Sequence, residues 1–304
     1  KQRKMINAIV FDVDDTIYDQ QAPFRRAISK VFPDFDMTDM NKAYIRYRHY
    51  SDLGFPKVIA GEWDIEYFRF YRTNETLKDL GYPEISRATG DYFQEIYEYE
   101  LENITMLDEM RLTLDFLKKR NIPVGVITNG PTEHQLKKVR KLGLYDYVEP
   151  SHVIVSQATG FQKPEKEIFN LAAQQFGMNP ETTLYVGDSY DNDVMGGHNG
   201  GWKTMWFNHR GRSISQGKKV HDVEIDSFEQ LFGAVKVLFD LPDNKYIMDS
   251  NDKTNPVLEL GIKSGVNLAA ERLLSTGKFD LEAVADMLEL SKKQVEFLTL
   301  KGYK

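Results

Sequence analysis

Short apolar segments separated by helix-like stretches constrain the fold of this chain more than any other feature. Their apolar residues are continuous rather than alternating, which suits strands that are buried on both faces of a sheet. Strands that alternate with helices imply a mostly parallel, doubly wound α/β sheet. The predicted strands cover residues 8–11, 124–128, 153–155, 183–186 and 204–207.

The stretches between the later strands have the spacing of amphipathic helices. We expect helices over residues 107–120, 133–142 and 164–176. The last one should open with Pro164 in its first turn and close at Gly177, since proline fits a helix start and glycine a helix end.

About a hundred residues, instead of a single crossover helix, separate the first predicted strand from the second. We therefore expect an inserted helical domain over residues 23–107, with a sheet-containing core formed by 1–22 and 108–241. Turn signals stand at 54–56 and 81–83. The aromatic residues of the insertion could line a substrate pocket, but packing of its own small core is the favoured explanation for any one of them.

The last part of the chain, residues 242–304, differs in character. Residues 242–255 are polar and resemble a linker, and Asp280 is a candidate cap for a helix over 281–288. Ser291 and Gln294 form a capping-box pattern before another short helix. The spacing resembles a helix-turn-helix, yet glutamates and aspartates dilute its lysines. We expect this tail to dock on a protein or on its own chain rather than on nucleic acid.

Composition narrows the class of protein. The 304 residues are 41% hydrophobic, which is enough for a substantial core, and the formal net charge of -7 argues against a generally basic nucleic-acid-binding surface. The chain has no cysteine, which fits a reducing compartment. No apolar stretch is long enough for a membrane span or a signal segment. We expect a cytoplasmic protein without a membrane partner.

Polar residues stand at the ends of three predicted strands. In open parallel sheets, ligands bind at the carboxyl ends of the strands, so these residues should converge on one crevice. Two neighbouring carboxylates repel each other, and a divalent cation is the simplest means of keeping both charged. An all-oxygen ligand set indicates Mg²⁺ rather than zinc. The residues concerned are Asp12, Asp14, Thr128, Asn129, Asp188 and Asp193, with Lys163 between the second and third groups.

These motifs resemble those of the haloacid dehalogenase superfamily of phosphohydrolases. Asp12, Asp14 and Thr16 match its first motif, Asp-x-Asp-x-Thr/Val, and Thr128 matches the second. Lys163 matches the third motif, and Gly187-Asp188 with Asp193 matches the fourth. The resemblance covers about residues 6–241 and implies a Rossmann-like core with a helical cap inserted after the first motif. The tail lies outside it.

The resemblance also implies a role for each residue of the first motif. Asp12 would attack phosphorus and form an aspartyl-phosphate, and Asp14 would protonate the leaving alcohol and then activate water. Asp12 and Asp188 would hold Mg²⁺ through their carboxylates, and Asp14 through its backbone carbonyl.

The remaining matches would bind phosphate or support those that do. Thr128, Asn129 and Lys163 would bind phosphoryl oxygens. Asp193 would orient Lys163 or a metal-bound water. Taken singly, each residue has a plainer explanation as a helix cap, a strand end or a surface lysine. We expect Asp15 and Asp191 to be surface or loop-capping residues, and no histidine spacing indicates a metal site.

The predicted function is Mg²⁺-dependent hydrolysis of a small phosphorylated metabolite. Asp14 argues against dehalogenation, for which the resemblance requires neither a metal nor the second aspartate. Arginines of the insertion could meet an acidic leaving group, as in a phosphoglycolate phosphatase, or its aromatics could stack on a base, as in a nucleotidase. A sugar phosphate also remains open. The alternative is a non-catalytic phosphate sensor whose helical tail binds DNA or a protein.

Overall fold

The computed structural model describes residues 5–214, 217, 219–240 and 281–288, together with 274, 295 and 299. The chain divides into two compact units. The inserted unit is Asp19–Thr105, and the core unit comprises the residues before and after it. The predicted linker, the proposed cap Asp280 and the capping box at Ser291 lie outside the described residues.

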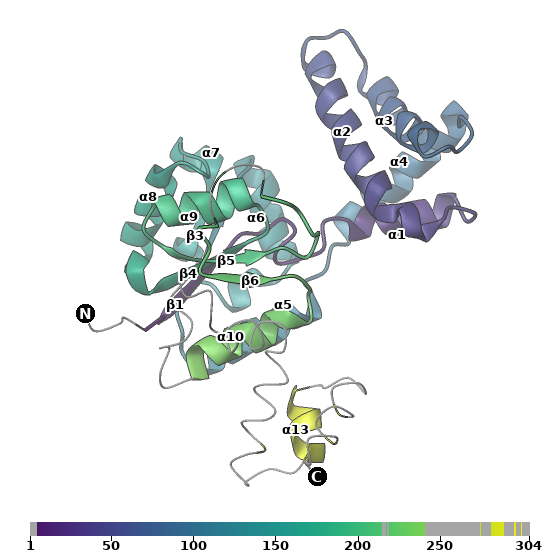
Figure 1. Ribbon diagram of the computed structural model, residues 1–304. Helices are drawn as coiled ribbons and strands as arrows, with labels where there is room; N and C mark the ends of the chain where they lie inside the picture. The colour runs from purple at the N-terminus through teal and green to yellow at the C-terminus, as the bar shows by residue number, and fades with distance from the viewer. Residues whose placement is uncertain are drawn as a thin grey trace. The chain divides into compact units, whose positions relative to one another are not determined.

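A parallel sheet forms the centre of the core unit, which confirms the predicted fold class (Figure 1). Its strand order is β3-β2-β1-β4-β5-β6, and every neighbouring pair is parallel. Val10 lies opposite Gly125 on one side and Tyr185 on the other, so β1 is central. The strands are β1 (Ala8–Phe11), β2 (Val124–Thr128), β3 (Val153–Val155), β4 (Thr183–Gly187), β5 (Lys203–Phe207) and β6 (Val223–Ile225).

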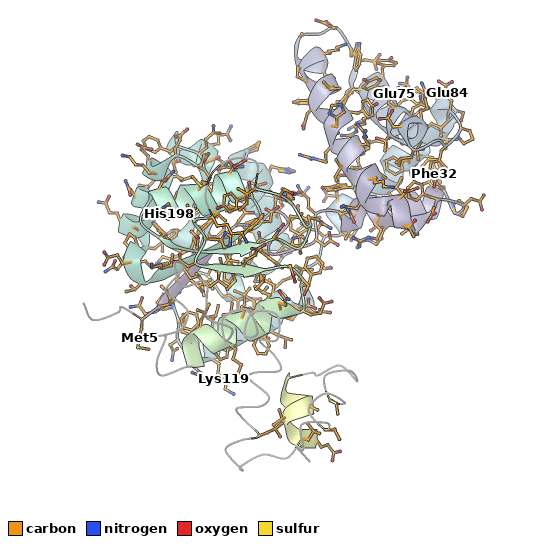
Figure 2. All side chains as sticks on the ribbon, in the orientation of Figure 1. Met5, Phe32, Glu75, Glu84, Lys119 and His198 are labelled. Carbon is orange, nitrogen blue, oxygen red and sulfur yellow. The ribbon has the colours of Figure 1, made fainter. Side chains whose placement is uncertain are left out.

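Helices cover both faces of this sheet, as a doubly wound fold requires. Helices α5 (Asp108–Lys119) and α10 (Gln230–Asp240) lie side by side along one face, and α8 (Lys166–Phe176) and α9 (Gly196–Asn199) along the other (Figure 1). Lys119 of α5 and His198 of α9, both exposed, are labelled in Figure 2. Helix α6 (Thr132–Lys141) follows β2, and the short α7 (Ser156–Thr159) follows β3.

Apolar packing between α8 and the sheet explains why this face is buried. Phe169 and Phe176 of α8 pack with Val10, Ile127 and Tyr185 of three neighbouring strands. Phe169 and Tyr185 meet edge to face with ring centroids 5.1 Å apart, an arrangement that aromatic rings favour. This layer fixes the strand ends that carry the predicted site.

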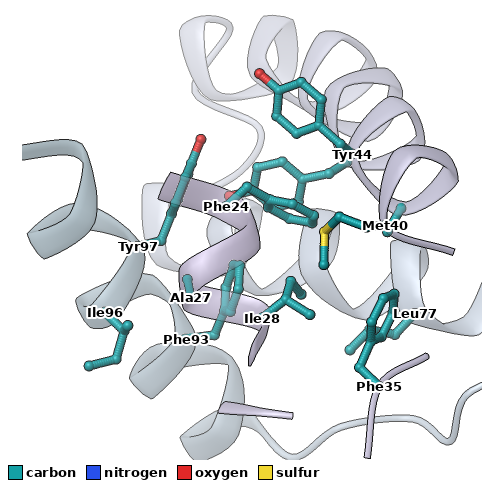
Figure 3. Packing of buried hydrophobic residues seen from close by; sticks show 12 residues of the cluster. Phe24, Ala27, Ile28, Phe35, Met40, Tyr44, Leu77, Phe93, Ile96 and Tyr97 are labelled. Carbon is teal, nitrogen blue, oxygen red and sulfur yellow. The ribbon is translucent and has the colours of Figure 1, made fainter. Parts of the chain in front are cut away.

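The inserted unit is helical and has a core of its own. Its main helices are α1 (Ala22–Val31), α2 (Met40–Ile59), α3 (Ile65–Asp79) and α4 (Arg87–Glu102). Phe24 lies at the centre of this core, with its ring centroid 4.7 Å from that of Tyr47 and 5.9 Å from that of Phe93 (Figure 3). These aromatics are buried in packing, as expected for the core of a small unit.

The predicted turn at residues 54–56 is wrong, because α2 runs through it. Ala60 donates its backbone N–H to Pro56 at 2.9 Å, so the helix continues past the proline. A Cβ on Gly54 would lie 2.8 Å from Phe68 of α3, so the glycine permits close packing of these two helices. Packing between α2 and α3 therefore offsets the loss of the backbone hydrogen bond that a proline cannot donate. The turn at Gly81 is present, with a φ of 85°.

Two further details differ from the sequence predictions. Helix α8 begins at Lys166 rather than at Pro164, because residues 162–165 form a turn in which Glu165 N donates to Gln162 O at 2.8 Å. It does end at Gly177, whose φ is 65°. Strand β6 was not predicted, because the charged Glu224 interrupts its apolar residues.

A helix over 281–288 is present as predicted, and we denote it α13 (Leu281–Leu288). Its Leu281 and Val284 are buried. Within the part of the chain that the structure describes, no helix combines the length and the apolar character that crossing a lipid bilayer demands.

Candidate functional site

The predicted site residues lie at the carboxyl edge of the sheet. Asp12 directly follows β1, Thr128 is the last residue of β2, and Asp188 directly follows β4. Because β1 is hydrogen-bonded to both other strands, these three ends are adjacent. The backbone N–H of Asp12 donates to Val186 O at 2.9 Å, which extends this pairing beyond β1.

Lys163 lies at the centre of the cluster. Its Nζ donates to Asp12 Oδ1 at 2.6 Å, to Asp193 Oδ1 at 2.7 Å and to Tyr185 Oη at 3.0 Å. Only 3% of the Lys163 side chain is exposed, so a surface lysine is excluded. Three residues from distant parts of the chain thus satisfy all three protons of one buried ammonium group.

Burial and charge act on these groups in opposite directions. Burial raises the pKa of the Asp12 carboxyl to about 7, although the Lys163 ammonium opposes the change. Burial would lower the pKa of Lys163, but Asp12 and Asp193 outweigh it and raise that pKa well above its usual range. Burial also raises the pKa of Asp188, and the nearby Asp193 and Asp12 carboxylates add to the effect. The site therefore has an excess of buried negative charge.

Asp193 is fixed by the π-helical turn that follows β4, Tyr190–Met195. Its Oδ2 accepts from Ser189 N at 2.9 Å, and its own N–H donates to Ser189 O at 2.8 Å. A Cβ on Gly187 would lie 2.3 Å from Asp193 Cγ, so only glycine fits at the end of β4. The glycine of the Gly-Asp motif therefore permits Asp193 to reach Lys163.

Asn129 holds the main chain of Lys163. Asn129 Nδ2 donates to Lys163 O at 2.9 Å, and Lys163 N donates to Asn129 Oδ1 at the same distance. The amide thereby connects the end of β2 with the lysine, and its contact with a phosphoryl oxygen stays a prediction. Thr128 is fully buried, and its Oγ1 accepts from Gln135 Nε2.

The Asp14 carboxylate is contacted from two directions. Its Oδ1 accepts from Lys138 Nζ and from Tyr18 Oη, both at 2.6 Å, and its Oδ2 accepts from Gln135 Nε2 at 3.0 Å. Burial would raise the pKa of Asp14, but the Lys138 ammonium and these hydrogen bonds hold it below the usual value.

The prediction that Asp15 is a surface or loop-capping residue is wrong. Asp15 is 2% exposed, and Arg210 donates to both of its oxygens, at 2.7 and 2.9 Å. A buried carboxylate requires such a partner. Arg212, in the same loop, donates from Nη1 to Asp188 Oδ2 at 2.7 Å. Asp191 is exposed, as expected.

Three carboxylates of the site lie close enough together that they could hold a cation. One oxygen each from Asp12, Asp188 and Asp193 lie within 4.8 Å of one another, and all three residues are buried. Their oxygens are the hard ligands that Mg²⁺ prefers. The side chain of Asp14 is directed to Gln135 and Lys138 instead.

Sequence reasoning missed several residues that contact the site. Gln135 and Lys138 lie three positions apart on α6, which places them on one helix face, but α6 is rich in basic residues and resembles a solvated helix. Tyr185 was identifiable in principle, because a tyrosine in a buried strand needs a partner for its hydroxyl. Arg212 lies in a loop after a strand end, where ligand-binding residues commonly occur.

Comparison with known proteins gives a consistent result. The model of the haloacid dehalogenase-like hydrolases matches residues 6–201. The HAD-hydrolase YfnB of Bacillus subtilis is 30% identical over 67% of this chain and 85% of its own length. A glyceraldehyde 3-phosphate phosphatase of Pyrococcus furiosus is 31% identical over 67% of this chain and 81% of its own. The pyrimidine 5'-nucleotidase YjjG of Escherichia coli is 37% identical over 32% of this chain and 43% of its own.

A solved structure extends the similarity to the fold. The structure of YfnB bound to magnesium superposes with a TM-score of 0.53 and 29% identity. The superposition covers 76% of this chain and 99% of YfnB. The residues that the family model matches contain strands β1 to β4 and every residue of the cluster around Lys163. The chain therefore belongs to the haloacid dehalogenase-like hydrolases and is an enzyme of that family.

Proposed function

We propose that this enzyme hydrolyses a small phosphomonoester, with Asp12 as the nucleophile and Asp14 as the acid and base. The observation that carries the proposal is the convergence of Asp12, Asp188 and Asp193 on one edge of the sheet, with Lys163 between them. A phosphate bound there meets a nucleophile and a fixed cation in a buried setting, where electrostatic stabilisation is strongest.

The reaction proceeds in two displacements at phosphorus. In the first, an Asp12 oxygen forms a bond to phosphorus, the bond to the leaving oxygen breaks, and Asp14 supplies a proton to that oxygen. In the second, Asp14 takes a proton from water, the water oxygen attacks phosphorus, and the bond to Asp12 breaks. Covalent catalysis of this kind divides one difficult step into two easier ones.

The protonation state of Asp14 changes when the phosphate ester binds. In the free enzyme, Lys138 favours the carboxylate form. An anionic phosphate beside Asp14 raises the affinity of that carboxylate for a proton, because like charges disfavour each other. Asp14 therefore gains the proton that it donates when the substrate is in place, and regains the base form after the alcohol leaves.

The residues present fit Mg²⁺. Burial, together with repulsion between neighbouring carboxylates, raises the pKa values of Asp12 and Asp188, and a divalent cation would offset the repulsion. Asp12, Asp188 and the backbone carbonyl of Asp14 would hold the ion. When bound, the ion supplies positive charge that neutralises the phosphoryl group. Asp193 has both oxygens engaged by Lys163, Tyr185 and Ser189, and it acts by orienting Lys163.

Thr128 and Lys163 bind the phosphoryl oxygens. Both are buried, and both are fixed by neighbours: Thr128 by Gln135, and Lys163 by Asn129 and Asp193. Hydrogen-bond donors that are already fixed lose little conformational freedom when negative charge develops on the phosphoryl group. Asn129 contributes by fixing Lys163 and is a further candidate for phosphate contact.

The substrate is a small phosphorylated metabolite. The relatives include a phosphatase of a triose phosphate and a pyrimidine nucleotidase, which supports a sugar phosphate or a nucleoside monophosphate. A phosphoglycolate-like acid stays a candidate, since arginines occur in the inserted unit, which we propose to be the cap. Among these, Arg46 pairs with Asp79 at 3.6 Å and Arg69 with Glu98 at 2.7 Å, and Arg48 of α2 is exposed.

The test is phosphate release from p-nitrophenyl phosphate and a panel of phosphorylated metabolites. We expect turnover that requires Mg²⁺, that chelation with EDTA abolishes and added Mg²⁺ restores, and that Asp12→Asn reduces by at least about a thousandfold. Lys137→Met, an exposed residue of α6, is the control. Absence of phosphate release by the unmodified enzyme from every ester would favour a phosphate-sensing regulator instead.

A further inference from the structure

Two residues of α6 contact the proposed acid and base, and neither forms or breaks a bond in the mechanism above. Gln135 and Lys138 lie on one face of α6, and each contacts a different oxygen of the Asp14 carboxylate. Asp14 follows β1, more than a hundred residues earlier in the chain. The two contacts therefore depend on tertiary structure and do not result from local geometry.

Gln135 connects Asp14 with the phosphate side of the site. It is 1% exposed, and its Nε2 donates both to Asp14 Oδ2 at 3.0 Å and to Thr128 Oγ1. Its side chain packs against Gly130, where a Cβ would lie 3.0 Å from Gln135 Cγ. Gly130 has a φ of 144°, a backbone conformation that favours glycine. The chain after β2 thus leaves room for Gln135 to reach both partners.

Lys138 acts on the other oxygen. Its Nζ lies 2.6 Å from Asp14 Oδ1, and only 15% of its side chain is exposed. The Asp14 side chain is 25% exposed, so solvent reaches it while both of its oxygens are held. Gln135 and Lys138 together restrict rotation of the carboxyl group. A catalytic group that is held near its reactive position avoids the entropy loss of being placed there during each turnover.

We propose that Gln135 and Lys138 are positioning residues that hold the Asp14 carboxyl beside the phosphate site for its proton transfers. This inference rests on the proposed function. The proton moves from an Asp14 oxygen to the leaving oxygen, which keeps the electron pair of the broken bond to phosphorus. Gln135 and Lys138 form and break no bond and act through the location of Asp14.

The consequence depends on the leaving group. An alkoxide leaves poorly without a proton, whereas p-nitrophenolate leaves readily without one. The ratio kcat/KM reports the steps through breakage of the first phosphorus–oxygen bond, so it isolates this proton transfer from the later attack of water. Misplacement of Asp14 should therefore reduce kcat/KM for alkyl and unsubstituted phenyl phosphates and spare p-nitrophenyl phosphate.

The experiment measures kcat/KM of the full chain with Mg²⁺ for a series of phenyl phosphates of graded leaving-group acidity and one alkyl phosphate. For Lys138→Met we expect a loss of about tenfold to a hundredfold with the alkyl ester and less than about threefold with p-nitrophenyl phosphate. Lys138→Arg, which keeps the positive charge, should recover part of the loss. Lys137→Met, on the exposed side of the same helix, should match the unmodified enzyme with every ester.

A double-mutant comparison separates positioning from a general structural effect. Asp14→Asn should produce the same leaving-group dependence, and adding Lys138→Met to it should cause no further selective loss, because residues that act as one unit are not additive. Gln135→Leu supplies an independent variant if Lys138→Met does not fold.

Three results would overturn the inference: an equal loss with all esters, no loss with any, or a further selective loss in the Asp14→Asn background. Failure of the proposed function gives a different result. In that case the unmodified enzyme releases phosphate from none of the esters, and the inference is rejected together with the function.

Discussion

Lys163 is a buried positive charge that pairs with two buried carboxylates, those of Asp12 and Asp193. Its ammonium group lies between Asp12 and Asp193 and offsets the repulsion of these two carboxylates. A buried ion pair adds little stability relative to apolar packing, but removing one partner leaves the other charge uncompensated. The same ammonium group is proposed to bind phosphate, so stability and catalysis converge on one residue.

Replacing Lys163 should therefore destabilise the protein as well as inactivate it. We expect Lys163→Met to lower the free energy of unfolding by about 3 to 5 kcal/mol, measured by urea denaturation without Mg²⁺. Lys203→Met is the matched control: Lys203 pairs with Asp222 at 3.3 Å and is 31% exposed, so its loss should cost less than about 1 kcal/mol. Equal losses for the two variants would contradict the buried-charge account.

Glu224 gives a prediction about pH. A hydrogen bond from His221, supported by one from Asn208 and opposed by burial, lowers the pKa of Glu224 from 4.5 to about 2. The folded protein thus binds the Glu224 proton more weakly than the unfolded chain. The resulting stabilisation is complete above pH 4.5 and disappears as the pH falls toward about 2.

Glu224→Gln should remove this contribution. Its free energy of unfolding should lie below that of the unmodified protein at neutral pH, and the difference should shrink as the pH falls below 4.5. Urea denaturation at several pH values measures it, with the exposed Glu149→Gln as the control for loss of one charge. A difference that grows toward acid pH would show that Glu224 is not stabilised as a carboxylate.

At the scale of elements, strand β4 and the turn after it place two acidic residues. Gly187 ends the strand, Asp188 follows it, and the turn returns Asp193 against the glycine. The side chain of Trp206 in β5 donates to the backbone oxygen of Asp188 at 2.9 Å and fixes the start of this turn. Asp193 can pack this closely against the strand end only if that residue has no side chain.

Gly187→Ala should displace residues of the site, because it adds a Cβ at the end of β4. A Cβ only 2.3 Å from Asp193 Cγ must displace Asp193 and, through it, Lys163. We expect a stability loss of about 1 to 3 kcal/mol and a reduction of at least about tenfold in kcat/KM.

Gly177→Ala is the matched control for this substitution. Gly177 has a φ of 65° and no heavy atom near its Cβ position, so its replacement should cost about 1 kcal/mol from backbone strain and leave kcat/KM unchanged. Retention of full activity by Gly187→Ala would show that the position of Asp193 is not critical.

At the scale of the whole molecule, two units have separate apolar cores. One surrounds Phe24 in the inserted unit, and another surrounds Phe169 in the core unit. Both phenylalanines are fully buried, so each truncation to alanine should cost about 3 to 5 kcal/mol. Separate cores allow each unit to open locally without the other.

Native-state hydrogen exchange distinguishes the two units. In Phe24→Ala, we expect amides of Asp19–Thr105 to lose protection while those of β1 and β4 keep theirs. Phe169→Ala should give the reverse pattern. Uniform loss of protection in both variants would mean that the two units unfold as one cooperative body.

The sequence alone determined the succession of strands β1 to β5 with the helices between them, and the motif residues at the strand ends, because both are local. Apolar runs form buried strands, and the carboxyl ends of parallel strands share one edge, so Asp12, Thr128 and Asp188 could be grouped without coordinates. Only the tertiary structure decided which side chains form hydrogen bonds and ion pairs with these residues. Packing between distant segments brings Gln135 and Lys138 to Asp14, and it brings Arg210 to the buried Asp15. Such partners leave no periodic signal, and packing likewise kept α2 helical through Pro56 where local preference predicted a turn.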